Sequence, residues 1–311
     1  MGSYISTTKF FEWPFRTKKL NPNNRGLIFT MKTTNEEIIE VLSKSNLNHI
    51  QTTTNPSDDE LIIINEVLKK NPNIAFRHYF GFGVECADIS YLLKLTYLKH
   101  LYLDLYCKIQ NIDVIQKWDL ESLTLSCFNV KEYSFLRNVS PKIKYLTIEL
   151  GDKTYKMDIN DIIHMKELES LGLRNVKKEL DKLIHFQSLK ELYLRSVSIK
   201  DYSFLQKMNV KKIYLGFQNV EYFDTFGINE SIEEVSLWMN KKLIDLSFLL
   251  QFPNLKRVII SNQNRVKIIP NLKKLQKLEE IYFLDRNPEE IKKYCNSNVK
   301  VYSQYNPADI S

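Results

Sequence analysis

The sequence predicts an α/β solenoid, in which a short strand and a short helix alternate along most of the 311 residues. Three observations support this prediction. An apolar Leu-x-x-Leu-x-Leu pattern occurs nine times, its period is 21 to 25 residues, and several units end in an acidic-x-Ser-aromatic-Leu run. Apolar residues at positions 0, +3 and +5 match neither a long helical stripe nor a full strand alternation. Such a period is typical of repeat folds, in which each unit buries its apolar side against its neighbours.

The nine repeat units align on the first apolar residue of the pattern. These residues are Leu98, Leu120, Ile143, Leu168, Leu189, Val210, Ile232, Leu255 and Leu278. Positions +3 and +5 are apolar in every unit, as Leu192 and Leu194 are in the unit that begins at Leu189. Alternate strand residues point to opposite sides, so +3 and +5 face an interior while +2, +4 and +6 face an open side. We therefore expect a parallel sheet with one buried face and one open face.

The segment that follows several of these strands has a signature of its own. The runs are Asp88-Ile-Ser-Tyr-Leu92, Glu132-Tyr-Ser-Phe-Leu136, Asp201-Tyr-Ser-Phe-Leu205 and Asp245-Leu-Ser-Phe-Leu249. Asp and Ser commonly cap helix N-termini. We expect each run to begin a short returning helix, with its aromatic and leucine side chains packed inward beneath it.

The period and the pattern resemble the leucine-rich-repeat family over roughly two-thirds of the chain. The returning runs resemble those of internalin-like bacterial repeats. The resemblance implies a right-handed solenoid with a parallel concave sheet, short convex helices and a non-enzymatic protein-binding role. Among bacterial relatives it implies an immunity protein that neutralises a cognate toxin, or an intracellular adaptor. The asparagine that many such families carry at position +8 is present only as Asn240, so the turns are expected to be hydrogen-bonded differently.

The chain is expected to have three parts. Residues 1–33 contain a strong turn signal at Asn21-Pro22-Asn23-Asn24 between two apolar segments, which predicts a β-hairpin cap. Residues 34–302 form the solenoid, whose first two units are irregular and begin at Leu47 and Ile74, with spacings of 27 and 24 residues. Terminal repeats often depart from the consensus because they cap the stack. Residues 303–311 are predicted to be a polar C-terminal tail.

The sequence favours neither catalysis nor a cofactor. Only 8 glycines are present, and no nucleotide-binding fingerprint, Walker segment, Gly-x-Ser-x-Gly or His-Glu-x-x-His motif occurs. His164 and His185 each precede the first leucine of a unit by four residues, where a helix C-terminus favours histidine. His78 and His100 are expected to be adjacent on the open face with Asp104 near them, and a metal site there is the alternative to a structural role. We regard both histidine pairs as structural and predict no metal, no cofactor and no enzymatic activity.

Cysteine usage and hydropathy predict a cytoplasmic protein. The four cysteines, Cys86, Cys107, Cys127 and Cys295, form no C-x-x-C pair. No apolar signal core is found at the N-terminus, and no apolar run is long enough to span a membrane. Reduced thiols in the cytosol are therefore expected, without a membrane segment.

The open side of the predicted sheet is rich in the residue types that dominate protein interfaces. The candidate protein-binding residues are Tyr102, Tyr145, Arg174, Tyr193, Arg195, Lys212, Tyr214, Trp238, Arg257 and Tyr282. Tyr, Trp and Arg are typical hot-spot residues, although tyrosine is also a good strand former. Arg174, Tyr193, Arg195, Tyr214 and Trp238 are expected to lie side by side at the centre. We expect Gly172 and Gly216 to leave hollows beside them, and Glu191 and Glu234 to hold the arginines extended.

Charge discriminates between classes of partner. The chain has 44 Lys and Arg against 37 Asp and Glu, a formal net charge of +7. The open side nevertheless has four basic and five acidic residues, including Asp104, Glu149 and Glu280. A surface that follows a phosphate backbone should not be balanced in this way. We therefore predict a protein partner, such as a toxin, and no nucleic-acid partner. The alternative is a nucleic-acid-binding or enzyme-regulatory module that uses the basic helical edge. The sequence leaves the oligomeric state open.

Overall fold

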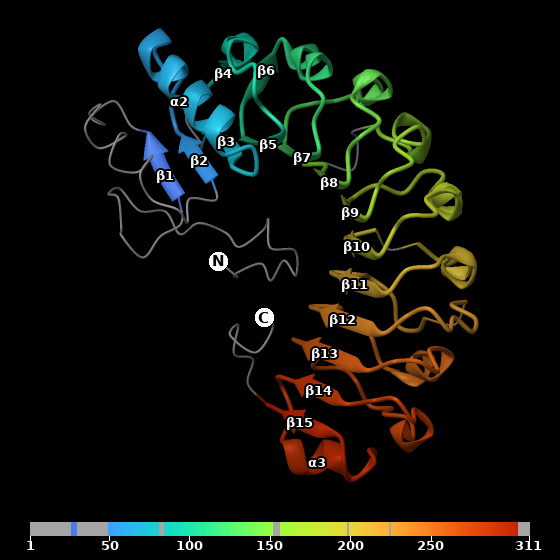
Figure 1. The fold of residues 1–311 in the computed structure, drawn as a ribbon. Helices are drawn as coiled ribbons and strands as arrows, with labels where there is room; N and C mark the ends of the chain where they lie inside the picture. Colours follow the sequence, from blue (N-terminus) through green and yellow to red (C-terminus); the bar gives the residue numbers. More distant parts are fainter. Residues whose placement is uncertain are drawn as a thin grey trace. The chain divides into compact units, whose positions relative to one another are not determined.

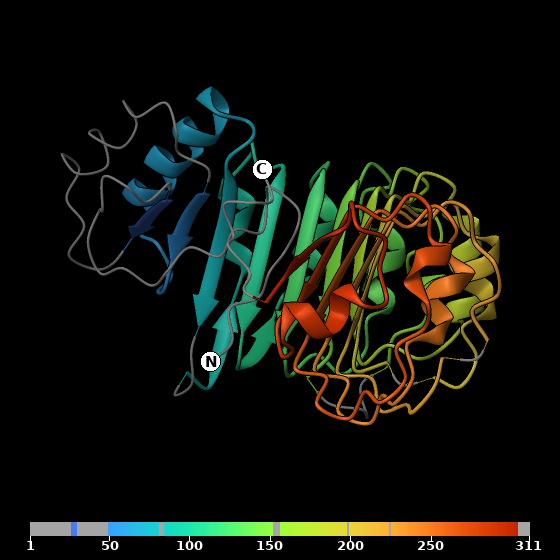
Figure 2. The ribbon, with the colours of Figure 1, turned by 90° about the horizontal axis from the view of Figure 1, so that it is seen from below.

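The computed structural model describes residues 26–29, 49–80, 84–151, 156–197, 199–223 and 225–303. The chain divides into two compact units, Met1–Lys156 and Met157–Ser311. In each unit the strands form one side and the helical turns form the other (Figure 1). Within each unit the strands of the main sheet run in the same direction (Figure 2). Among the described residues, no helix is both long and apolar enough to cross a membrane.

The first unit contains a parallel sheet in the order β1-β2-β3-β5-β7-β8. Its elements are β1 (Gly26–Phe29), β2 (His49–Thr52), α2 (Asp58–Lys70), β3 (Ala75–Phe80), β4 (Cys86–Asp88), η1 (Ser90–Lys94), β5 (His100–Leu105), β6 (Lys108–Gln110), η2 (Ile112–Lys117), β7 (Ser122–Cys127), η3 (Ser134–Asn138) and β8 (Tyr145–Glu149). The short strands β4 and β6 pair separately. Helix α2 begins with a capping box, because the Ser57 side chain accepts from the Glu60 backbone N–H while the Glu60 carboxylate accepts from the Ser57 N–H.

The second unit contains a parallel sheet in which consecutive strands from β9 to β15 are neighbours. Its elements are η4 (Ile159–Asp161), β9 (Ser170–Arg174), η5 (Leu180–His185), β10 (Glu191–Arg195), η6 (Ser203–Lys207), β11 (Lys212–Gly216), β12 (Glu234–Trp238), η7 (Ser247–Gln251), β13 (Arg257–Ser261), η8 (Leu272–Lys274), β14 (Glu280–Phe283), α3 (Pro288–Lys292) and β15 (Lys300–Tyr302).

The register of the regular units confirms the predicted pattern. Leu192 pairs with Leu171 on one side and with Ile213 on the other, and all three are at most 2% exposed. Positions +3 and +5 therefore face the core of each unit, as the alternation of strand residues requires. The returning segments are also confirmed, but most of those described are 3-10 helices. A single turn is enough to cross the core. At the start of η6 the Asp201 carboxylate accepts a hydrogen bond from the Ser203 N–H at 2.8 Å.

The second of the two irregular repeats contains β3 and lies in the first compact unit. Its predicted register is wrong by one residue. Ile50 pairs with Phe76, and Phe76 pairs with Leu101, so the spacings are 26 and 25 residues rather than 27 and 24. A shift of one residue exchanges the two faces of a strand. Arg77 therefore lies on the open side, and His78 points into the core, where it is 0% exposed.

Most of the predicted N-terminal hairpin, residues 1–33, lies outside the described residues. The part within them is β1, which pairs in parallel with β2. Residues 304–311 of the predicted tail also lie outside the described residues. At the end of the solenoid, Ile281 pairs with Val301, so the last predicted strand is present as β15.

Candidate functional site

The register of the second unit brings the central candidate residues together. At position +6, Arg174 pairs with Arg195, Arg195 with Gly216, and Gly216 with Trp238. We call this line of residues the +6 row. At position +4, Tyr193 pairs with Tyr214 on the adjacent strand. Because neighbouring strands lie about 4.8 Å apart, the cluster spans about 15 Å across β9 to β12. The predicted side-by-side arrangement is confirmed.

Tyr193 and Tyr214 form an aromatic pair in the middle of this face. Their ring centroids are 6.0 Å apart with an interplanar angle of 36°. The Tyr193 hydroxyl donates to the Glu191 carboxylate at 3.0 Å, which fixes one ring relative to its own strand. Both tyrosines and Trp238 are half-buried. Together they offer aromatic surface that is already ordered before a partner arrives.

The predicted hollow at Gly216 is wrong, because the Tyr214 side chain fills it. A Cβ on Gly216 would lie 2.6 Å from Tyr214 Cε1 and 2.7 Å from its hydroxyl oxygen. The tyrosine ring therefore lies against the backbone two residues further along its own strand. The missing Cβ of Gly216 leaves the room that the Tyr214 ring occupies.

Acidic and basic residues alternate at position +2 from β10 to β14. We call this line of residues the +2 row; it contains Glu191, Lys212, Glu234, Arg257 and Glu280. Lys212 Nζ lies 3.5 Å from a Glu191 carboxylate oxygen, and Arg257 contacts Glu234 at 3.5 Å and Glu280 at 2.9 Å. Burial raises the pKa of Glu234, while Lys212 and Arg257 act in the opposite direction. Glu191 and Glu234 were expected to hold Arg174 and Arg195; their observed ion pairs are with Lys212 and Arg257.

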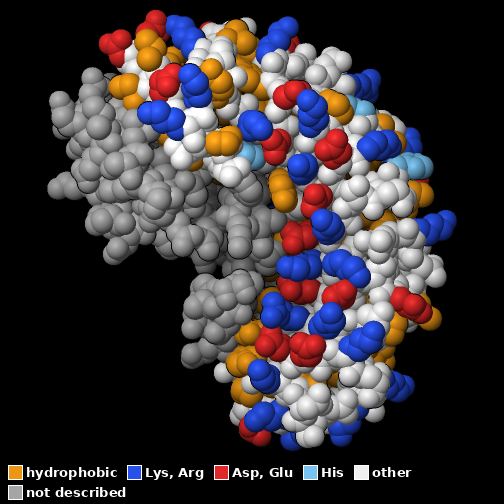
Figure 3. Space-filling view, in the orientation of Figure 1, with side chains coloured by type: hydrophobic (Ala, Val, Ile, Leu, Met, Phe, Trp, Pro, Cys, Tyr) orange, Lys and Arg blue, Asp and Glu red, His pale blue; other side chains and the backbone are white. Residues whose placement is uncertain are grey.

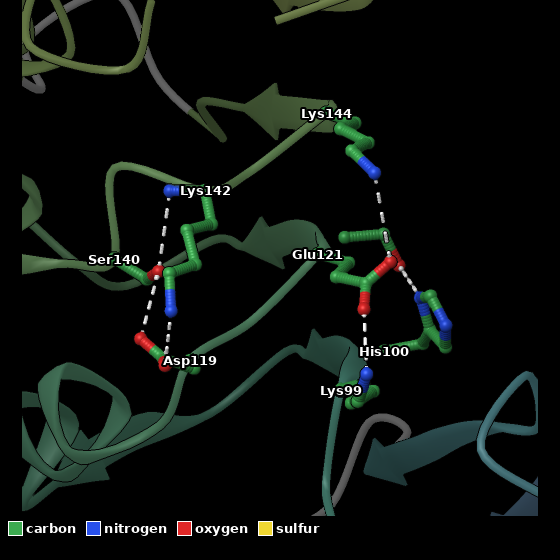
Figure 4. A network of polar contacts seen from close by, with 8 residues as sticks. Lys99, His100, Asp119, Glu121, Ser140, Lys142 and Lys144 are labelled. Carbon is green, nitrogen blue, oxygen red and sulfur yellow. Dashed lines mark hydrogen bonds and ion pairs between the residues drawn. The ribbon is translucent and has the colours of Figure 1, made fainter. Parts of the chain in front are cut away.

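A second alternation lies one residue earlier, at position +1. In the second unit, Glu233 binds Lys211 at 2.8 Å and Lys256 at 2.7 Å, and hydrogen bonds from these two lysines lower its pKa to about 2. In the first unit, Glu121 lies between Lys99 at 2.7 Å and Lys144 at 4.0 Å (Figure 4). Figure 3 shows basic and acidic side chains intermixed over β9 to β14. These lysines therefore already have carboxylate partners on neighbouring strands.

The strands of the second unit end in a repeated left-handed turn. The residues with positive φ that follow β9 to β13 are Asn175, Ser196, Phe217, Met239 and Asn262, with φ between 51° and 61°. The Phe217 N–H donates to the Trp238 carbonyl on the next strand at 2.8 Å. Left-handed backbone is uncommon for an aromatic residue. Here it places the Phe217 ring beside Arg195, whose Cζ lies 4.7 Å from the ring centroid.

The remaining candidate residues lie further along the two sheets. In the second unit, Tyr282 occupies position +4 of β14 but is only 2% exposed, and it stacks on Tyr302 at 4.6 Å. In the first unit, Tyr102 and Tyr145 lie on β5 and β8 and are half-buried. Sequence reasoning missed Arg77, which is ion-paired with Asp104 at 2.5 Å and lies 4.6 Å from the Tyr102 ring. The correct register of β3 would have revealed it.

The structure separates the two histidines proposed as an alternative metal pair. His78 faces the core, where its Nδ1 lies 2.8 Å from Thr52 Oγ1 and 2.6 Å from the Tyr91 hydroxyl oxygen. His100 lies at position +2, and its Nδ1 is 3.0 Å from Ser122 Oγ. Within the described ranges, no group of three or more His, Cys, Asp or Glu side chains is placed to hold a metal ion.

Comparison with known proteins supports the fold through structure rather than sequence. Neither a family model nor a curated protein matches the sequence. An internalin from Listeria monocytogenes is similar in structure, with a TM-score of 0.51 and 17% identity, over 88% of this chain and 90% of that one. The chain has the leucine-rich-repeat fold.

Two further solved structures are similar at lower scores. A chain of the mouse RP105/MD-1 complex has a TM-score of 0.48 and 13% identity, over 83% of this chain and 51% of that chain. A leucine-rich-repeat protein from Leptospira interrogans has a TM-score of 0.36 and 15% identity, over 88% of both chains.

In one leucine-rich-repeat turn of the second unit, Gln218 stands in place of the consensus asparagine, next to the one asparagine that is present, Asn240. Asn240 donates to the Leu215 carbonyl at 2.8 Å and accepts from the Gln218 N–H at 2.7 Å. Gln218, at position +8 of the preceding unit, donates to the Leu194 carbonyl at 2.8 Å. A longer glutamine side chain therefore satisfies the same kind of buried backbone group. The prediction that these turns are built differently is confirmed.

Proposed function

We propose that this leucine-rich-repeat chain is a non-enzymatic protein-binding module, and that it binds through the open face of the second unit. The observation that carries the proposal is the cluster of Tyr193, Tyr214 and Trp238 with two arginines on four adjacent strands. Large ordered aromatic side chains near the centre of a surface provide most of the energy in protein interfaces. The aromatic rings are half-buried, so part of their surface is available to a partner.

We further propose a role in the cytoplasm, either as an immunity protein that neutralises a toxin or as an adaptor. The resemblance of the repeats to bacterial leucine-rich repeats motivates both roles. The four cysteines are free thiols, which is the state that a reducing compartment maintains. An inhibitor and an adaptor would use the same face, and they differ in whether the bound partner loses its activity.

The alternative function, nucleic-acid binding along the basic helical edge, has weaker support. Lysines at position +1 contact glutamates of neighbouring strands, as Lys211 and Lys256 both contact Glu233. Phosphate binding to such lysines would have to compete with carboxylates already in place. Binding that is weak and is lost between low and physiological salt is therefore what we expect for any nucleic acid.

A crosslinking experiment with an affinity series tests the proposal. A photo-crosslinking amino acid at Ser236, between Tyr214 and Trp238 in the site, should capture the partner in the native cells, whereas one at Lys273 should not. With the purified partner, Tyr193→Ala or Trp238→Ala should each weaken binding by about 2 kcal/mol or more, which is about 30-fold. Lys177→Ala and Lys273→Ala are matched exposed controls and should change the affinity by less than about twofold.

Unchanged affinity of the Tyr193→Ala/Arg195→Ala/Trp238→Ala variant would contradict the proposed site. The partner's own activity then separates the two roles. Loss of that activity on binding identifies an inhibitor, and retention identifies an adaptor.

A further inference from the structure

We infer that the first unit contains an acid-sensitive switch at His78. Protonation of this histidine opens the structure around β3 and η1, while the second unit, which carries the proposed binding face, stays folded. The inference goes beyond the proposed function, because it concerns the pH range in which the first unit keeps its structure. Three features support it: the surroundings of the His78 ring, the contrast between the histidines of the two units, and the local character of stability in a repeat fold.

The surroundings of the His78 ring favour its neutral form. The ring is 0% exposed, and its Nδ1 lies 2.8 Å from Thr52 Oγ1 and 2.6 Å from the Tyr91 hydroxyl oxygen. Its Nε2 is also buried and has no hydrogen-bond partner among the described residues. The neutral ring can carry its hydrogen on Nδ1, where either hydroxyl oxygen can accept it. In the protonated ring Nε2 carries a hydrogen as well, and this buried charged donor has neither an acceptor nor water.

Among the described residues, no charged side chain faces the ring to compensate a positive charge. Tyr91, from η1, is the titratable group in contact with it, and burial raises the pKa of this hydroxyl, so it stays neutral. Arg77, the preceding residue of β3, lies on the open side, where it is ion-paired with Asp104. On β5 the paired residue is Leu103, and the buried residues of α2 are Leu61, Ile64, Val67 and Leu68. Protonation of His78 is therefore favourable only where the unit opens and water reaches the ring.

Buried histidines distinguish the first unit from the second. His78 and His100 are 0% and 3% exposed, while in the second unit His164 is half-buried and His185 is exposed. Burial lowers the pKa of His78 to about 3 and is the main cause that lowers the pKa of His100. Because these folded-state pKa values lie below those of the unfolded chain, stability is lost as the pH falls below about 6.5. In the second unit the pKa of Glu233 is lowered to about 2, so its ion pairs persist at pH 5.

Opening at β3 should remain local. In a repeat solenoid each repeat contacts its neighbours, so the stability of one repeat depends on those beside it rather than on the whole chain. Strand β3 pairs with β2 and β5, and all three belong to the first compact unit. Opening these strands therefore costs less free energy than unfolding both units.

Two buried cysteines serve as reporters of opening in the natural chain. Cys107 follows β5 in the first unit and is 2% exposed, whereas Cys295 lies in the second unit and is 4% exposed. Cys86 is exposed and provides the accessible reference. The full chain is pulse-labelled at pH 7.5 and at pH 5 with dithiodipyridine, a disulfide that reacts with thiols in mild acid. Mass spectrometry of the peptides gives the rate at each cysteine, divided by the rate in the urea-unfolded chain at the same pH.

Acid should expose Cys107 and leave Cys295 protected. About 1.5 pH units separate pH 5 from the ordinary histidine pKa of 6.5, so protonation of His78 should raise the opening equilibrium about 30-fold. We expect the relative rate at Cys107 to rise at least about tenfold, and the rate at Cys295 to stay constant. His78→Gln keeps a hydrogen-bonding side chain that does not titrate, and the rise at Cys107 should be at least about fivefold smaller in this variant. His78→Leu is a second variant that does not titrate, and circular dichroism verifies that each is folded.

Three results would overturn the inference. Cys107 that is as protected at pH 5 as at pH 7.5 would show that the first unit does not open. An equal rise at Cys107 and Cys295 would show that the two units unfold together. A full rise at Cys107 in the folded His78 variants would assign the acid sensitivity to other groups. The first two results come from the natural chain, so they do not depend on the folding of any variant.

Discussion

The Tyr214 ring lies over Gly216, so closely that a Cβ on the glycine would be 2.6 Å from the ring. Gly151 is crowded in the first unit too, but there a Cβ would be 2.8 Å from both the Cα and the carbonyl oxygen of Phe128. The two contacts differ in what must move. The end of a half-buried side chain can swing outward, whereas a strand-terminal backbone can yield only by distorting the turn.

Gly216→Ala and Gly151→Ala should therefore have different effects. Gly216→Ala should change the free energy of unfolding by at most about 0.5 kcal/mol and should expose Tyr214. Gly151→Ala should cost about 1–3 kcal/mol because it overpacks against backbone atoms. Urea unfolding gives the free energies, and nitration identified by mass spectrometry reports the exposure of Tyr214. Equal unfolding midpoints for the two variants would contradict this reading of the contacts.

The core register predicts a large effect at Leu192. This residue is 1% exposed and pairs with Leu171 and Ile213, so Leu192→Ala should cost about 2–5 kcal/mol through lost burial and a residual cavity. Ser236→Ala is the control, because Ser236 lies half-buried on the open side and should change stability by at most about 0.5 kcal/mol. Chemical denaturation measures both. Comparable losses would contradict the assignment of Leu192 to the core and Ser236 to the open side.

The ion pairs of the +2 row should be coupled. Glu234 is 7% exposed, and Arg257→Met removes a cation from it and from Glu280, so the variant should lose about 1–3 kcal/mol of stability. Glu234→Gln should recover part of this loss, since an amide is less costly to bury without a counter-charge. A double-mutant cycle measured by urea unfolding gives the coupling energy. Strictly additive losses would mean that the pair contributes nothing.

Buried His78 should make the protein sensitive to acid. Burial lowers the pKa of His78 to about 3, from an ordinary value of 6.5. The unfolded chain therefore takes up a proton below pH 6.5 that the folded chain refuses until about pH 3, so stability falls as the pH decreases through this window. Between pH 7.5 and 5 the loss should be about 2 kcal/mol from this residue.

His78→Leu tests that assignment, because leucine occupies the paired position 103 on the next strand. The variant should have a shallower dependence of unfolding free energy on pH, whatever its stability at neutral pH. Ser236→Ala, which removes no titratable group from a half-buried position, is the control and should leave the dependence unchanged. An unaltered slope in His78→Leu would assign the acid sensitivity to other groups, among them His49, whose pKa burial lowers to about 4.

The sequence by itself determined the repeat, the register of the regular units and the face on which each side chain lies. Leu171, Leu192 and Ile213 could be placed in one buried column because a strand alternates with a fixed period of two. The same alternation placed Arg174, Arg195 and Trp238 in one row. This reasoning failed at His78. The repeat that contains it is 26 residues from the preceding one, and its inward position +5 holds this histidine where the regular repeats have an apolar residue.

Only the tertiary structure decided which neighbours each open-face side chain contacts. The register places Glu191 next to Lys212 on the adjacent strand. Long charged side chains can reach several partners with similar free energies, so the ion pair between these two residues could not be predicted from the register. Nor was the position of Tyr214, which depends on a rotamer and on the missing Cβ of Gly216. Strand periodicity constrains the backbone and the direction of each Cβ, whereas the geometry of the binding surface depends on side-chain torsions that no periodic pattern encodes.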